Sequence, residues 1–191
     1  MPFDRLIAGV DAWADRSGRT DVFAQIGPTA LRPRAIRWEA FITPSEFRTR
    51  VRECDALVAH AGMGSILTAL EFGKPVLVMP RRASHLETRN DHQVATANRL
   101  KALGKLHVAM DEHELPRMLD RLGVLGAAGV IEPFASPSLL RAVRDFIHAR
   151  PGTAQNIEPK VPEPIFAHAA PPTPASDIEI RPTSPGQAVP R

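Results

Sequence analysis

Two short apolar runs, separated by a segment of helix length, most constrain the fold of this chain. Residues 55–59 read DALVA and residues 75–80 read PVLVMP, and neither run alternates between apolar and polar side chains. Strands buried on both faces have this pattern, which is typical of parallel sheets. Parallel neighbours need a crossover of a dozen or more residues, usually a helix, and residues 60–74 can supply it. The two runs therefore predict a β-α-β unit.

Further segments alternate in the same way along most of the chain. Apolar residues at helical spacing mark the helices, and short apolar runs mark the strands. This alternation predicts an α/β fold, a Rossmann-like doubly wound parallel sheet. We expect strands at residues 21–27, 36–42, 55–59, 75–80 and 105–109, and helices at residues 3–16, 87–103, 112–121 and 136–149, with two more that begin at Thr43 or Ser45 and at Ser65.

The composition changes near Pro151. Ten of the nineteen prolines lie in residues 151–191, where aliphatic residues are few and helical periodicity is absent. Such a segment cannot bury enough apolar surface to offset the entropy lost on ordering. We therefore predict a domain at residues 1–150 and a disordered Pro-rich tail at residues 151–191. The tail is either passive or a proline-rich docking ligand.

The composition favours a soluble, cytoplasmic protein. Hydrophobic residues make up 43% of the chain, yet no apolar run is long enough to cross a bilayer, and the N-terminus does not read as a signal peptide. Cys54 is the single cysteine, so no internal disulfide forms. Aromatic residues make up 5%, tyrosine is absent and the net charge is +3, with basic residues dispersed, which disfavours a nucleic-acid binder.

A loop of small residues follows the strand predicted at residues 55–59. It contains His60, Gly62, Gly64 and Ser65, and a helix begins at its end. Ligands of doubly wound sheets bind beyond the carboxyl ends of the strands, and the free N–H groups of a helix N-terminus favour an anion. Glycines let main-chain amides approach a phosphate, and the histidine ring N–H can donate to it. The alternative is a plain strand-to-helix turn, because Gly-x-Gly alone is a weak signal.

Polar side chains also crowd the loop after the strand predicted at residues 75–80. Such density between an apolar strand and a helix is costly unless the groups are solvated or bound to a ligand. Solvated loop charges are one interpretation, and a sugar or nucleotide site is the other, since Asp and Gln side chains bond sugar hydroxyls. The residues are Arg81, Arg82, His85, Glu87, Thr88, Arg89, Asn90, Asp91, His92 and Gln93.

The two motifs, HAGMGSILTALEFGKPVLVMPRR and then ETRNDHQVATA, resemble the C-terminal, donor-binding half of family 28 glycosyltransferases, which have the two-domain GT-B fold. The resemblance extends from Phe3 to Ala109. It is closest to single-domain members of the family, namely bacterial exopolysaccharide subunits and the soluble subunit of the eukaryotic transferase that adds GlcNAc to a dolichol-linked acceptor.

The resemblance implies roles for individual residues. The loop from Gly62 through Gly64 to Ser65 would face the UDP diphosphate, with His60 beside it. Asp91 and Gln93 would lie near the donor sugar, with Asn90 alongside. If the sugar is glucuronic acid, Arg81 or Arg82 would pair with its carboxylate; GlcNAc is the other candidate.

Two positions depart from the family pattern. Thr68 stands where many GT-B enzymes have an acidic residue that accepts from both ribose hydroxyls, and it offers only an uncharged contact. Members also begin with a strand and a Gly-Thr loop ahead of the segment that matches PFDRL, whereas this sequence opens at Met1-Pro2-Phe3. Either a strand is absent or the start of the chain has been placed too late.

The resemblance further implies a reaction and its partners. A UDP-sugar is the donor substrate, with no metal and no other cofactor, and the acceptor is lipid-linked, as in polysaccharide biosynthesis. The general base and acceptor site come from the other GT-B half, so no catalytic residue is assigned here. We expect a membrane-associated partner subunit that recruits the chain to the inner membrane face.

Two other functions remain open at this stage. One is a non-catalytic scaffold or regulatory subunit of the same complex, which Thr68 and the absent strand would favour. The other is a metal-dependent hydrolase that uses His85, Glu87, Asp91 and His92. Their spacing lacks the His-Glu-x-x-His regularity that places metal ligands on one helix face, so we give this alternative little weight.

Overall fold

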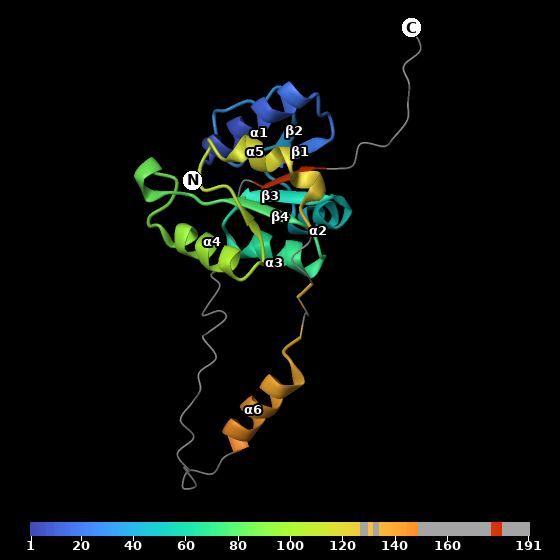
Figure 1. Cartoon of the computed structure of the whole chain (residues 1–191), viewed down its shortest axis with the longest axis vertical. Helices are drawn as coiled ribbons and strands as arrows, with labels where there is room; N and C mark the ends of the chain where they lie inside the picture. The colour runs from blue at the N-terminus through green and yellow to red at the C-terminus, as the bar shows by residue number, and fades with distance from the viewer. Residues whose placement is uncertain (127–129, 132–133, 149–176, 181–191) are drawn as a thin grey trace. The chain divides into compact units, whose positions relative to one another are not determined.

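The computed structural model describes residues 1–126, 130–131, 134–148 and 177–180, and the other residues are drawn as a grey trace in Figure 1. The chain divides into two compact units, residues 1–131 with 172–191, and residues 132–171. The second unit contains α6 (Pro137–His148), in agreement with the helix predicted there. The predicted boundary at Pro151 lies outside the described residues and stays a prediction.

The first unit contains the other described elements, which follow the predicted alternation of strands and helices. In chain order they are α1 (Asp4–Ser17), β1 (Val22–Gln25), β2 (Arg37–Glu39), α2 (Pro44–Glu53), β3 (Ala56–His60), α3 (Met63–Glu71), β4 (Val76–Met79), the 3-10 helix η1 (Ala83–His85), α4 (His92–Ala102), β5 (His107–Val108), α5 (Leu115–Asp120), the 3-10 helix η2 (Leu122–Val124) and β6 (Asp177–Ile180).

Local sequence signals explain the ends of several helices. Helix α2 begins after Thr43, whose hydroxyl accepts from the Glu46 N–H at 3.2 Å, so Thr43 rather than Ser45 is the cap. Helix α3 begins at Met63, two residues ahead of the predicted start. Helix α4 begins at His92 and not at residue 87. The reason is that Asp91 accepts from the Ala83 N–H at 2.9 Å, which holds the preceding residues in a loop.

The sheet has the strand order β2-β1-β6-β3-β4-β5. Strand β1 is parallel to β2, and β3, β4 and β5 are parallel to one another, which confirms the predicted parallel sheet and its Rossmann-like character. Strand β6 runs antiparallel to both of its neighbours, β1 and β3. It therefore joins the two parallel parts of the sheet.

Strand β6 corrects part of the prediction for the C-terminal segment. Residues 151–191 are predicted to lack regular structure, and most of them lie outside the described residues, but Asp177–Ile180 form a strand. The prolines lie on either side of the short DIEI run, so they do not prevent its four residues from pairing with the sheet. The side chain of Ile178 is 0% exposed and belongs to the main apolar core, so this run buries enough surface to hold its place.

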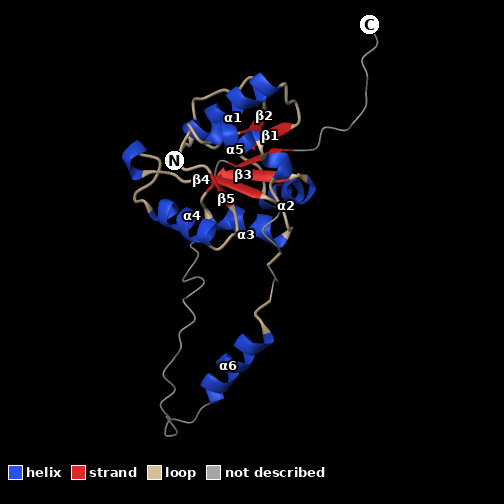
Figure 2. Cartoon of the chain, in the orientation of Figure 1, coloured by secondary structure: helices blue, strands red, loops and turns tan. Residues whose placement is uncertain are grey.

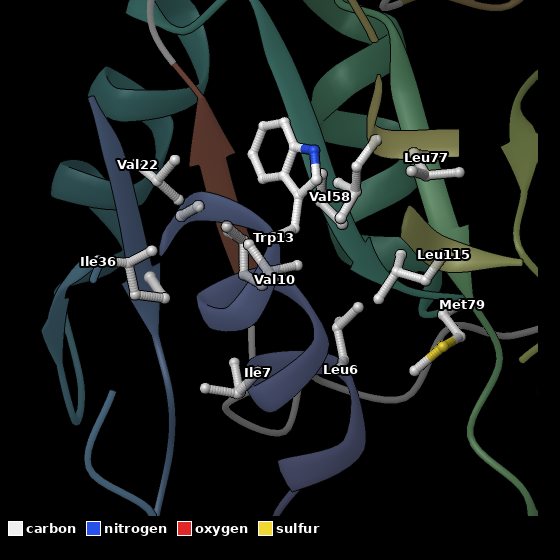
Figure 3. Packing of buried hydrophobic residues seen from close by; sticks show 14 of the residues in the cluster. Leu6, Ile7, Val10, Trp13, Val22, Ile36, Val58, Leu77, Met79 and Leu115 are labelled. Atoms are coloured by element: carbon white, nitrogen blue, oxygen red, sulfur yellow. The ribbon is translucent and has the colours of Figure 1, made fainter. Parts of the chain in front are cut away.

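Helices cover both faces of the sheet, as the doubly wound fold requires (Figure 2). Helices α1 and α5 pack on one face, and α2, α3 and α4 pack on the other. Figure 3 shows the first layer, in which α1 places Leu6, Val10 and Trp13 against Val58 and Leu77 of the sheet. The predicted helical spacing of α1 is thus confirmed by its buried face.

We predict that Ile178→Ala lowers the free energy of unfolding by about 2–5 kcal/mol, because it leaves a cavity in the apolar core between the sheet and α1. Urea denaturation of the full chain measures this. Ile147→Ala makes the same chemical change in α6, where the side chain is 68% exposed, and is expected to change stability by less than about 0.5 kcal/mol. Equal effects of the two substitutions would show that β6 does not occupy the sheet.

Candidate functional site

The candidate site lies at the carboxyl ends of β3 and β4. Strand β3 ends at His60, and α3 begins three residues later with Gly62 as its N-cap. Among the described residues, no side chain caps this helix, and its first intrahelical bond runs from the Ile66 N–H to the Gly62 carbonyl at 3.2 Å. The Gly62 N–H donates to the His60 carbonyl at 2.8 Å, so the amides of Met63 and Gly64 are the ones that point out of the helix end, where the dipole favours an anion.

Gly62 makes room for the imidazole of His60. A Cβ added at Gly62 would lie 2.7 Å from Nε2 and 2.8 Å from Nδ1 of His60, and closer still to Cε1. The backbone of Gly62 has φ −91° and ψ 135°, which any residue can adopt. The glycine is therefore needed for close approach of the His60 ring, whereas the sequence argument assigned it to approach of a ligand.

Gln93 brings His60 and the end of β4 together. Its Oε1 lies 3.2 Å from Nδ1 of His60 and 3.2 Å from the main-chain N of Arg81. Gln93 is in the first turn of α4, so one side-chain oxygen connects β3, the residues after β4 and a helix that follows. Of the predicted site residues, this trio and the start of α3 form the compact part of the site.

The environment of His60 keeps the ring neutral. Burial of the ring, followed by the positive charge of Arg81, lowers the pKa of His60 from its ordinary 6.5 to about 4, although the hydrogen bond with Gln93 acts in the opposite direction. At neutral pH the imidazole therefore carries one proton and no charge.

Three predicted residues of α3 take different positions. Gly64 is exposed in the first turn, next to the outward-pointing amides. Ser65 is buried, in contrast to Gly64. The Thr68 hydroxyl donates to the Gly64 carbonyl at 2.9 Å, which occupies its one donor within its own helix.

Arg81 and Arg82 brace the loop after β4. One Nη of Arg81 donates to the carbonyls of Met1, at 2.7 Å, and Glu87, at 3.3 Å, and the side chain is 7% exposed. Arg82 donates to the Met110 carbonyl at 2.9 Å. Both guanidinium groups thus bond main-chain carbonyls, and the expected contact of either one with a sugar carboxylate stays a prediction. Arg81 contributes to the site through its main-chain N–H.

Asn90 and Asp91 are exposed at the start of α4. The Asn90 side chain accepts from the His92 N–H at 3.3 Å, and Asp91 accepts from the Ala83 N–H at 2.9 Å. Each thus fixes the loop with one oxygen and keeps further acceptor positions open to solvent. They border the site rather than belong to the trio around Gln93.

A partly buried ion cluster, which no local sequence pattern predicts, supports this loop. Arg5 of α1 donates to both oxygens of Glu87, at 3.0 and 2.9 Å, and to Glu112 at 2.7 Å. Glu87 also accepts from the Arg82 N–H at 3.0 Å. Glu87 was visible as one of many polar residues, but no local pattern pairs it with Arg5, which is 82 positions away.

The described residues contain neither a metal-binding cluster nor a helix that could span a membrane. Within the ranges that the structure describes, no three His, Cys, Asp or Glu side chains gather where they could hold a metal ion. Glu87, which the hydrolase alternative would use, is engaged by Arg5. No helix among the described residues combines the length and apolar character needed to cross a membrane.

The fold and site define a Rossmann-like α/β domain, a class whose ligands bind at the carboxyl edge of the sheet. Comparison with known families is more specific. The model of the glycosyltransferase family 28 C-terminal domain matches residues 2–123, and the chain belongs to this family. The resemblance inferred from the two sequence motifs is thereby confirmed.

Curated relatives carry the name UDP-N-acetylglucosamine transferase subunit ALG13. The Mus musculus protein is 28% identical over 149 residues, which cover 72% of this chain and 12% of the mouse protein. The Cryptococcus neoformans protein is 29% identical over 140 residues, 72% of this chain and 64% of that protein. The Homo sapiens protein is 30% identical over 114 residues, which cover 54% of this chain and 10% of the human protein. The chain spans less than two thirds of the length of each relative.

We predict that Gly62→Ala lowers the free energy of unfolding by about 1–3 kcal/mol, because the new methyl group displaces the His60 ring. Urea denaturation measures this cost. In a chain that already carries His60→Ala, Gly62→Ala is expected to lower the free energy of unfolding by less than about 0.5 kcal/mol, because the imidazole that the methyl group would displace is absent. Gly123→Ala is the matched control, because a Cβ there meets nothing within 4 Å. An equal cost with and without the imidazole would refute the close approach.

We also predict that stability depends on pH through His60. With a pKa of about 4 in the folded state against 6.5 in the unfolded chain, the unfolded state binds more protons between these values. The contribution of neutral His60 to the free energy of unfolding is fully present above pH 6.5 and is lost as the pH falls towards 4. Unfolding midpoints of the native chain and His60→Gln, measured across this window, are expected to converge at the acid end. Parallel curves would contradict a neutral, buried imidazole.

Proposed function

We propose that this chain is the donor-binding subunit of a glycosyltransferase that moves a sugar from a UDP-sugar to a lipid-linked acceptor in polysaccharide biosynthesis. The observation that carries the proposal is the uncapped N-terminus of α3 beside His60 and Gln93, in a domain of glycosyltransferase family 28. The helix end supplies donors for an anion, and the neighbouring side chains supply neutral polar groups.

The diphosphate of the donor lies at the start of α3 in this proposal. The main-chain N–H groups of Met63 and Gly64 donate to its oxygens, and exposed Gly64 leaves space for the approach. The same donors stabilise the negative charge that grows on the leaving UDP as the bond to the sugar breaks. Thr68, one turn further along α3, faces the ribose region with an uncharged side chain.

The donor sugar lies towards the start of α4. The side-chain N–H₂ of Gln93 has no partner among the described residues, and the outer oxygens of Asn90 and Asp91 are exposed. These are the group types that bond sugar hydroxyls. The names of the relatives favour N-acetylglucosamine as the sugar, and the resemblance to bacterial exopolysaccharide subunits favours glucuronic acid.

A partner subunit completes the enzyme in this proposal. The relatives are named as subunits of a transferase, and the sugar acceptor needs a general base, a role for which the pKa of His60, about 4, is low. We place the base and the lipid-linked acceptor on a membrane-associated partner, which would hold this chain at the cytoplasmic face of the membrane.

A non-catalytic scaffold is the second candidate. It is favoured by Thr68, which offers the ribose no carboxylate and whose hydroxyl hydrogen is used by the Gly64 carbonyl. The two candidates differ in donor binding, because a scaffold has no need to bind a UDP-sugar.

We predict that the full chain binds UDP, as measured by isothermal titration calorimetry, and that Gly64→Val weakens binding by about tenfold or more. The branched side chain would block at least one charge-assisted hydrogen bond to the diphosphate. Gly123→Val makes the same change in open space and is expected to leave the affinity unaltered. Absence of binding at millimolar UDP by the native chain would favour the scaffold, and unaltered affinity in folded Gly64→Val would reduce the loop to a turn.

A further inference from the structure

The hydrogen bonds around Gln93 determine which nitrogen of His60 carries the proton. The main-chain N–H of Arg81 can only donate, so the Gln93 atom 3.2 Å from it is the carbonyl oxygen, Oε1. The same Oε1 lies 3.2 Å from Nδ1 of His60, and a carbonyl oxygen can only accept. Nδ1 therefore bears the hydrogen. Because a neutral imidazole has a single N–H, Nε2 presents a lone pair.

The surroundings of the ring preserve this tautomer. Gln93, from α4, is neutral, and the start of α3 brings glycine and methionine but no charged side chain. The charged group that acts on His60 is Arg81, after β4, and its positive charge opposes a second proton on the ring. Glu71, at the far end of α3, is paired with Arg48 at 2.6 Å. No carboxylate among these neighbours holds His60 in its protonated form.

A lone pair at Nε2 selects the chemistry of its partner. The oxygens of an ionised diphosphate only accept hydrogen bonds, so they gain nothing from this nitrogen. A sugar hydroxyl can donate to it. The N–H₂ of Gln93, on the same side chain that orients the ring, can donate in turn to the same or a neighbouring hydroxyl. An acceptor and a donor side by side form a site for a hydroxyl pair.

We propose that His60 is a specificity-determining residue that accepts a hydrogen bond from a hydroxyl of the donor sugar through Nε2, while the amides of α3 hold the diphosphate. This inference rests on the proposed function and replaces the expectation that the imidazole donates to a phosphate. Gln93 is a positioning residue for the ring as well as a sugar contact.

The tautomer is tested by nitrogen-15 NMR of the full chain, with His60 assigned from the signal lost in His60→Asn. We expect an unprotonated Nε2 and a protonated Nδ1 at neutral pH. Gln93→Leu removes the acceptor that fixes the ring and is expected to give a mixture of both tautomers. A protonated Nε2 in the native chain would overturn the inference, whether or not any nucleotide binds.

The contact is tested by comparing UDP-N-acetylglucosamine with UDP in calorimetric titrations of the native chain and His60→Asn. Asparagine keeps a donor towards Gln93 and removes the acceptor at Nε2. We expect the affinity for the sugar nucleotide to fall about tenfold and that for UDP to change less than about twofold. His113→Asn makes the same change at an exposed histidine outside the site and is expected to alter neither affinity.

The outcomes separate this inference from the proposed function. Equal losses for both ligands would place His60 on the diphosphate and overturn the inference alone, and unaltered binding of both would do the same. If the native chain binds neither ligand, the proposed function fails, and the assignment of a sugar contact fails with it.

Discussion

The antiparallel strand β6 joins the two parallel parts of the sheet, and the site depends on that connection. Its four residues pair with β1 on one side and with β3 on the other. Ile178 lies opposite Ala24 and Val58, under α1, where the main core is packed. Since β3 carries His60 at its end, a strand from the C-terminal part of the chain fixes the platform from which the loop to α3 leaves the sheet.

At the carboxyl edge of the sheet, a single side-chain oxygen connects the ends of two strands. Oε1 of Gln93 accepts from the imidazole of His60 and from the main chain of Arg81, so the ends of β3 and β4 are held by the first turn of α4. Behind this contact, the buried pair of Arg5 and Glu87 holds the same loop against α1. The helix amides that face outward are thus presented by elements fixed from both faces of the sheet.

Much of this arrangement could be predicted from local sequence, and the remainder could not, for a physical reason. The apolar pattern predicts buried strands such as Val76–Met79 and the amphipathic helix α1. The Gly-rich loop is predicted by its position after a strand. The role of Gly62 and the partner of Glu87 depend on side chains that meet only in three dimensions. Strand β6 is not predicted by its sequence, because it is only four residues long and lies in a Pro-rich segment. Its strand conformation depends on pairing with β1 and β3 rather than on its own β-propensity.

The kind of ligand atom that each group of the site can bind follows from whether that group donates or accepts hydrogen bonds. Main-chain amides at a helix end can only donate, which suits an anion, and they keep that character at every pH. A neutral imidazole with its proton committed to Gln93 can only accept at Nε2, which suits a hydroxyl. If His60 were instead protonated to hold a phosphate, a second cation would stand beside Arg81 in a half-buried site, at an electrostatic cost that the uncapped amides make unnecessary. The arrangement is therefore consistent with our proposal that the backbone of α3 binds the charged diphosphate and that the side chains of β3 and α4 bind the sugar.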